Sequence, residues 1–151
     1  MQIAGRSIQD PLSALDDYLR CHPQTVTCFD LASPGDPNRL IEAEVWRTHI
    51  IRSRISRNEM AWFVEVGHRA PWRDVPENTT LVAADPYTPS GRLLYERASA
   101  LWRVFWASTR ADQRVATAKI SKVLHVKRPH LIPLLDSRLV RCYRTAAAKA
   151  A

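Results

Sequence analysis

The sequence has few glycines, and their positions exclude several kinds of nucleotide site. Its four glycines, Gly5, Gly35, Gly67 and Gly91, never cluster. A loop that wraps a phosphate with backbone N–H groups needs closely spaced glycines, so a P-loop and a dinucleotide-binding loop are both disfavoured. No serine lies in a G-x-S-x-G turn, which also disfavours α/β-hydrolase chemistry.

Cysteine is scarce, histidine is unpaired, and long apolar runs are missing. Three cysteines do not make a disulfide framework, and we interpret Cys21 and Cys28 as small buried apolar residues. The five histidines show neither HxxxH nor cysteine-paired spacing, so we expect no metal and no cofactor. No apolar run is long enough to span a membrane, and residues 1–8 lack a signal-peptide pattern. These absences predict a cytoplasmic domain without membrane contact.

The composition is that of a folded domain with unevenly distributed charge. The 151 residues are 46% hydrophobic and 25% charged, which is typical of one globular domain. Residues 1–109 carry 12 Lys/Arg and 13 Asp/Glu, a net charge of −1, whereas residues 110–151 carry 10 and 2, a net charge of +8. Such a basic region favours a polyanionic partner, because each phosphate contact releases counterions.

Helical signals recur along the chain. Asp10-Pro11 predicts a helix start, and Ser56 followed by Glu59 has the capping-box pattern. Apolar residues follow helical spacing in residues 40–52, 94–105 and 116–124. Arg128-Pro129 predicts a helix end, because the residue before proline avoids the helical region. Asp136 or Ser137 is positioned to cap a last helix with Leu139 and Tyr143 inward.

Other segments depart from this periodicity. Residues 25–29 alternate and are β-branched, so we interpret them as a short extended segment. Residues 70–91 hold four prolines and predict an ordered loop with residues 81–83 buried. Together the patterns predict a mainly α fold: a single compact helical domain over residues 1–144, with five to six helices and at most a short strand pair. Residues 145–151 are expected to fray.

One run of residues carries a family resemblance. Residues 118–137, AKISKVLHVKRPHLIPLLDS, resemble a bacterial domain family of unknown function with a K-x-L-H-x-K-R-P-x-L-I-P-x-x-D signature. The segments FDLASPGDPNRL and RTHIIRSRIS are similar to the N-terminal part of that family. The resemblance implies a family but no activity.

The same run is similar to the end of the helix-hairpin-helix DNA glycosylase domain. Pro129, Pro133 and Asp136 match its layout, which implies a catalytic role for Asp136 and a nucleophilic role for Lys119. The departure lies in residues 109–114, which contain no glycine where that family has a glycine hairpin that approaches phosphate.

These observations favour binding over catalysis. We expect a nucleic-acid-binding protein, with duplex DNA as the favoured partner, whose contacts fix position on the phosphate backbone. The candidate contact residues are basic and belong to the C-terminal region: Lys119, Lys122, Lys127, Arg128, Arg138 and Arg141. One alternative is a protein-interaction module for an acidic partner. Another is a divergent glycosylase or lyase that uses Lys119 and Asp136.

Overall fold

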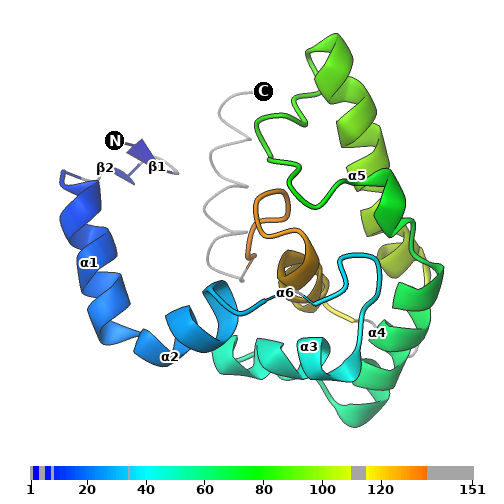
Figure 1. Ribbon diagram of the computed structural model, residues 1–151, viewed down its shortest axis with the longest axis horizontal. Coiled ribbons are helices and arrows are strands. Elements are labelled where there is room, and N and C mark those ends of the chain that lie inside the picture. The colour runs from blue at the N-terminus through cyan, green and yellow to red at the C-terminus, as the bar shows by residue number, and fades with distance from the viewer. Residues whose placement is uncertain (1, 4–5, 8, 34, 110–114, 136–151) are drawn as a thin grey trace.

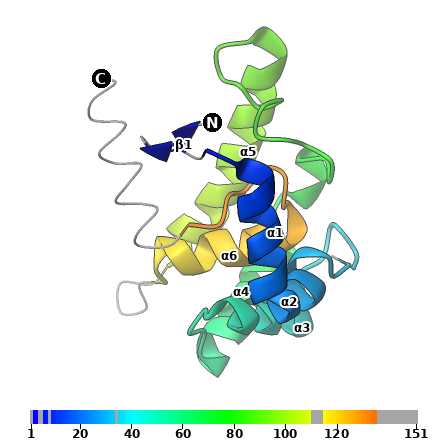
Figure 2. The same ribbon diagram turned by 90° about the vertical axis from the view of Figure 1, so that its left-hand side faces the viewer.

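Helix α6 (Thr117–Lys127) lies at the centre of the fold, among three other helices (Figures 1 and 2). These are α3 (Glu42–Arg47), α4 (Arg57–Arg69) and α5 (Pro89–Ala107). Helices α3 and α5 pack on α6, and α4 packs on α3 and α5. Ile120, Val123 and Leu124 of α6 are completely buried, at the spacing that the sequence predicts. The computed structural model of the chain describes residues 2–3, 6–7, 9–33, 35–109 and 115–135.

The remaining elements are short or peripheral. Helix α1 (Pro11–Cys21) and helix α2 (Pro23–Thr25) lead into the π-helical turn η1 (Val26–Asp30). Two 3-10 turns, η2 (Thr48–Ile51) and η3 (Trp72–Asp74), follow α3 and α4. Strands β1 (Gln2–Ile3) and β2 (Arg6–Ser7) pair antiparallel, with Gln2 opposite Ser7. Six α-helices and one short strand pair in the described part confirm the predicted fold class.

The core is built around aromatic side chains from three elements. Phe63 of α4 and Phe105 of α5 are fully buried, with ring centroids 6.2 Å apart. Trp72 of η3 packs on Phe105, and its indole Nε1 donates a 2.7 Å hydrogen bond to the carbonyl oxygen of Gly67. Gly67 is needed there, because a Cβ atom at this position would lie 2.9 Å from the Cβ of Leu40. The proline-rich stretch after α4 is thus tied into the core.

Two of the predicted helix caps, Asp10 and Ser56, are confirmed. The Asp10 side chain accepts hydrogen bonds from the backbone N–H groups of Leu12 and Ser13, each at 3.1 Å. The Ser56 hydroxyl accepts from the N–H of Glu59, and the Glu59 carboxylate accepts from the N–H of Ser56. Local sequence signals therefore fix where α1 and α4 begin.

The expectation of an extended segment at residues 25–29 is wrong. Pro23 occupies the first position of α2, and the chain continues as the helical turn η1 through Asp30. Phe29 is buried there and stacks on His125, with ring centroids 5.8 Å apart. Burial of Phe29 against α6 therefore overrides the β propensity of the residues before it.

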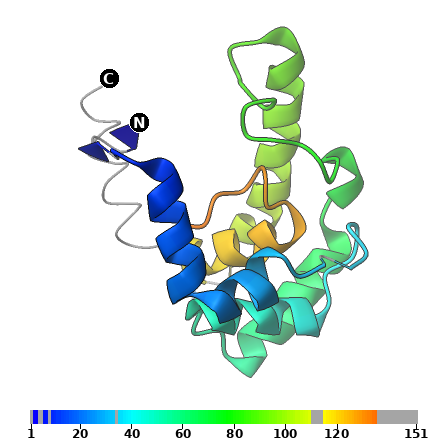
Figure 3. The same cartoon turned by 60° about the vertical axis from the view of Figure 1, so that its left-hand side comes forward.

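Several apolar residues that the sequence predicts to be buried are exposed. Residues 81–83 are exposed, and Val75, Thr79 and Ala84 supply the buried positions of their loop instead. Cys21 and Cys28 are exposed as well. Helix α1 extends to one side of the body that α3–α6 form (Figures 1 and 3) and buries none of its residues. The sequence identifies these residues as apolar, but the tertiary arrangement decides which of them are buried.

Several predictions fall on residues outside the described part. These are the last helix with Asp136, Arg138 and Arg141, the tail 145–151, and the stretch 110–114 that separates α5 from α6. The domain limits at residues 1–144 remain a prediction. No helix within the described ranges is long and apolar enough to cross a membrane.

Candidate functional site

Lys127, the last residue of α6, is buried although the sequence places it in a basic run. Its side chain is 0% exposed and forms an ion pair with the carboxylate of Glu44 in α3. Its Nζ also donates a 2.8 Å hydrogen bond to the carbonyl oxygen of Asp36. Burial lowers the pKa of the Lys127 ammonium, and the interaction with Glu44 offsets only part of that effect. The Lys127 ammonium thus bonds to groups of the chain itself, in the interior of the fold.

Arg128 is buried beside it and joins several segments. The guanidinium donates hydrogen bonds of 2.8–2.9 Å to backbone carbonyl oxygens. It also lies over the Trp72 ring, 5.6 Å from the centroid. Four carbonyl oxygens accept from this one side chain: those of Pro37, Trp72, Val75 and Lys127. Because both side chains are enclosed and bonded to the chain itself, we withdraw Lys127 and Arg128 from the predicted phosphate contacts.

Lys119 and Lys122 lie on the side of α6 that meets α4 and η2, and both are partly exposed. The Nζ of Lys119 forms a 2.6 Å ion pair with Glu59, near the start of α4. The Nζ of Lys122 donates a 3.0 Å hydrogen bond to the carbonyl oxygen of Ile51. Lys122 and Lys119 therefore reach the two ends of one connection, at the last residue of η2 and in the first turn of α4.

Glu59 is the acidic residue that contacts Lys119 at the start of α4. Burial raises the pKa of its carboxyl group, but hydrogen bonds from Lys119 and Ser56 outweigh burial, so the pKa lies below its ordinary value. Glu59 is thus held as a carboxylate that binds Lys119 and caps α4 together with Ser56.

The connection between η2 and α4 displays three arginines that sequence reasoning did not select. Ser53 and Ile55 are buried, whereas Arg52, Arg54 and Arg57 are exposed. Within the described ranges, none of these three side chains makes an ion pair or a hydrogen bond. We call Arg52, Arg54 and Arg57, together with Lys119 and Lys122, the basic surface.

The backbone of this connection is held in place. Arg52 adopts the left-handed conformation, with φ of 57°, and its N–H donates to the carbonyl oxygen of His49 at 2.9 Å. The ring nitrogens of His49 lie 3.0 Å from the carbonyl oxygens of Trp46 and Ile55. His49 therefore closes the turn and fixes where the arginines project.

A sequence signal for this surface exists, but the charge balance hides it. Residues 45–58 contain four arginines, Arg47 and the three of the basic surface, and no acidic residue. The count over residues 1–109 averages them with 13 acidic residues elsewhere, so that part of the chain is nearly neutral overall. The positive residues of two distant segments become neighbours only when α6 packs beside η2.

The predicted catalytic pair is not assembled within the described residues. Lys119 is ion-paired with Glu59, and Asp136 lies outside the described part. Among the described residues, no group of three or more His, Cys, Asp or Glu could hold a metal ion.

Comparison with family models finds a match over the second part of the chain. A family model described as a family of unknown function, DUF6308, matches residues 69–151, more than half of the chain. We expected the resemblance to include residues 29–40 and 47–56 as well, whereas the match begins at the last residue of α4. No curated protein and no solved structure matches.

Proposed function

The chain belongs to the DUF6308 family, and because that family has no assigned function, we propose one from the residues themselves: nucleic-acid binding through the basic surface, with duplex DNA as the favoured partner. The observation that carries the proposal is the set of three exposed arginines without a partner in the described chain, Arg52, Arg54 and Arg57. Arginine is well suited to phosphate, because its planar guanidinium donates two parallel hydrogen bonds.

The surroundings of these arginines support an anionic ligand. Glu59 is the nearest acidic residue along the chain, and Lys119 already neutralises it. The arginines lead into the start of α4, where the helix dipole adds positive potential. The segment is already fixed by His49 and by Lys122. Binding would therefore cost little conformational freedom beyond that of the arginine side chains themselves. The surface would thus position a phosphate backbone without reading its sequence.

Single-stranded nucleic acid is the second candidate, and Trp46 favours it. The Trp46 side chain is 57% exposed and lies against the His49 ring, with centroids 4.3 Å apart. His49 in turn contacts Ile55, between Arg54 and Arg57. An exposed aromatic ring beside arginines is the arrangement on which unpaired bases stack.

The test is fluorescence-anisotropy titration with a labelled duplex of random sequence and with one of its strands, each at low and at physiological salt. Replacing Arg52, Arg54 and Arg57 together by glutamine is expected to weaken duplex binding more than tenfold. The salt slope should fall by about three, because each phosphate contact contributes about 0.9 to it. Trp46→Ala should weaken only the single strand if bases stack there.

The matched control replaces three exposed arginines elsewhere, Arg69, Arg92 and Arg97, by glutamine and so makes the same change in net charge. This control should keep most of the affinity. Equal losses in both triple variants would mean that only net charge matters and would overturn the assigned surface. Absence of binding at low salt would overturn nucleic-acid binding and leave the acidic protein partner as the alternative for the same surface.

The glycosylase alternative finds less support. A nucleophilic lysine needs an amine that is free to attack, whereas the Nζ of Lys119 is held in a 2.6 Å ion pair with Glu59. We therefore give Lys119 an electrostatic role in the basic surface. Arg138 and Arg141 remain predicted phosphate contacts beyond the described residues.

A further inference from the structure

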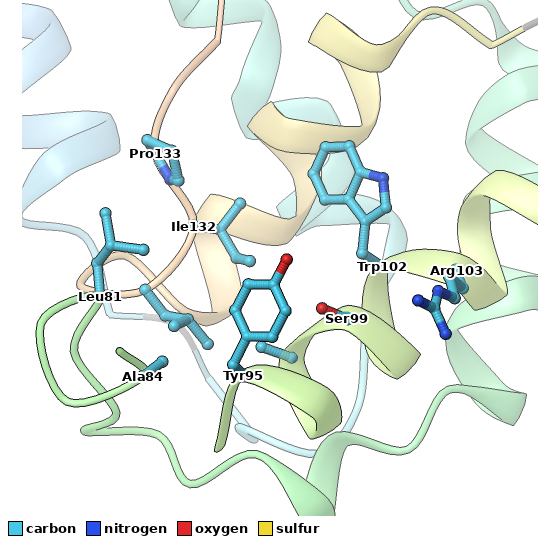
Figure 4. A pocket seen from close by; sticks show the side chains of 10 residues that line it. Leu81, Ala84, Tyr95, Ser99, Trp102, Arg103, Ile132 and Pro133 are labelled. Atoms are coloured by element: carbon cyan, nitrogen blue, oxygen red, sulfur yellow. The ribbon is translucent and has the colours of Figure 1, made fainter. Parts of the chain in front are cut away.

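A pocket of about 300 Å³ lies between the middle of α5 and the segment that follows α6 (Figure 4). Tyr95, Ser99 and Trp102 line one side, at positions that share one face of α5. Ile132 and Pro133 line the opposite side, and the loop before α5 contributes Leu81. The volume is within the range of small-molecule sites. All lining residues belong to the part of the chain that matches the family, unlike the arginines of the basic surface.

The wall opposite α5 is held by hydrogen bonds. Ile132 donates through its N–H to the carbonyl oxygen of Arg128 at 2.9 Å, and its own carbonyl oxygen lies 2.6 Å from Nδ1 of His125. The N–H of Leu81 donates to the carbonyl oxygen of His130 at 2.9 Å. The pocket is therefore formed before any ligand arrives, which lowers the entropic cost of binding.

The polar groups of the pocket are few and available. Tyr95 and Ser99 carry hydroxyl groups, and Arg103 carries the one charge of the lining. None of the three side chains forms a hydrogen bond or an ion pair with any residue that the structure describes. Figure 4 shows the Tyr95 hydroxyl directed into the space between Ile132 and Trp102. The lining thus combines aromatic and aliphatic walls with two hydroxyls and one cation.

We propose that this pocket binds a small organic anion with a planar apolar body, such as a ring system that carries a carboxylate. The rings of Tyr95 and Trp102 and the aliphatic wall would enclose the apolar body. The Arg103 guanidinium would pair with the carboxylate, and the hydroxyls of Tyr95 and Ser99 would donate to the same group. The proposal is independent of the basic surface, because the two sites share no residue.

The test follows the indole N–H signal of Trp102 in two-dimensional NMR spectra of the full chain. The probe is naphthalene-2-carboxylate, and its neutral analogue naphthalene-2-carboxamide serves as the matched compound. Trp102→Phe identifies the signal among those of the five tryptophans. We expect a saturable shift of this signal with the carboxylate, and binding of the carboxamide weaker by about tenfold, the usual value of one charge-assisted hydrogen bond.

Two arginine variants on the same helix test the anion contact. Arg103→Gln should weaken carboxylate binding by about tenfold and leave carboxamide binding unchanged. Arg97→Gln, an exposed residue of α5 that does not line the pocket, should leave both unchanged. Both side chains are exposed, so both variants should fold, as circular dichroism will check. Equal affinity for the two compounds, equal effects of the two variants, or a Trp102 signal that never saturates would each overturn the proposal.

Discussion

Lys127 and Glu44 form a buried ion pair that joins two segments 83 positions apart in the sequence. Arg128, the next residue, extends the connection to Pro37, Trp72 and Val75. Two consecutive basic residues therefore hold the loop before α3 and the turn after α4 against the end of α6. Their positive charge serves the fold and is not presented to a partner.

Lys127→Met should destabilise the protein strongly. The replacement leaves the Glu44 carboxylate buried without its cation, and breaking one partner of a buried pair typically costs about 3–5 kcal/mol. Urea unfolding followed by circular dichroism measures this free energy. The exposed pair Arg92–Glu96 supplies the control, since Glu96→Gln should cost less than about 1 kcal/mol. Similar losses in the two variants would contradict the structural role of Lys127.

Arg128→Lys should also be destabilising, although it conserves the charge. A lysine ammonium cannot reach carbonyl oxygens on three sides as the planar guanidinium does, so buried acceptors would lose their donors. We expect a loss of about 2–4 kcal/mol in the free energy of unfolding. Arg54→Lys is the control, because Arg54 is exposed, and it should leave stability unchanged. An unchanged Arg128→Lys variant would mean that the carbonyl contacts contribute little.

Phe105 and Trp102 belong to one predicted apolar stripe but should differ in their contribution to stability. Phe105 is completely buried, so Phe105→Ala should cost about 3–5 kcal/mol. Trp102 is half-buried and lines the pocket, so Trp102→Ala should cost less than about 2 kcal/mol. Thermal and urea unfolding of the two variants, measured side by side, check this order. A reversed order would place Trp102 in the core proper.

His125 should make stability depend on pH on the acid side of neutrality. Burial lowers the pKa of His125 in the folded protein, although its hydrogen bond with Ile132 partly offsets this. Below its ordinary pKa of 6.5, the unfolded chain takes up a proton that the folded protein resists. The free energy of unfolding should thus fall as the pH drops from 6.5 towards the folded pKa. His125→Gln should flatten this slope, whereas His68→Gln, at an exposed position, should preserve it.

Glu59 should make the free energy of unfolding depend on pH in a lower range than His125 does. Its pKa lies below the ordinary 4.5 in the folded protein, because hydrogen bonds from Lys119 and Ser56 outweigh burial. Its contribution to stability is therefore fully present above pH 4.5 and is lost as the pH falls through the folded pKa. Glu59→Gln should make the acid limb of the stability curve shallower. Glu65→Gln, which breaks an exposed pair with Arg69, should not change that limb.

The sequence predicts where α1 and α4 begin and which spacing α5 and α6 bury, because local signals determine these features. The caps at Asp10 and Ser56 and the apolar spacing of α5 and α6 depend on residues only a few positions apart. Burial of Lys127 and Arg128 depends instead on Glu44 and on carbonyl groups far away in the sequence. A run of basic residues predicts side chains exposed to solvent. No short-range pattern distinguishes the buried Lys127 and Arg128 from Lys119 and Lys122.

The basic surface was predictable only in part for the same reason. Lys119 and Lys122 are recognisable as neighbours on one helix, and Arg52 and Arg54 as neighbours in one segment. Their meeting requires the contact between Lys122 and the carbonyl oxygen of Ile51, which lies 71 positions away. The alternation of buried Ser53 and Ile55 with exposed arginines likewise becomes visible only against the packed helices.

The long span between Glu44 and Lys127 has a consequence for how the protein is made. During synthesis on the ribosome, Glu44 and the carbonyl groups of Asp36 and Pro37 emerge well before the side chains that bind them. The first half of the nascent chain therefore carries an unmatched carboxylate and an open apolar face until α6 has left the exit tunnel. We expect chains that stop before α6 to be captured by chaperones or degraded, and the native fold to form in one step once α6 has emerged.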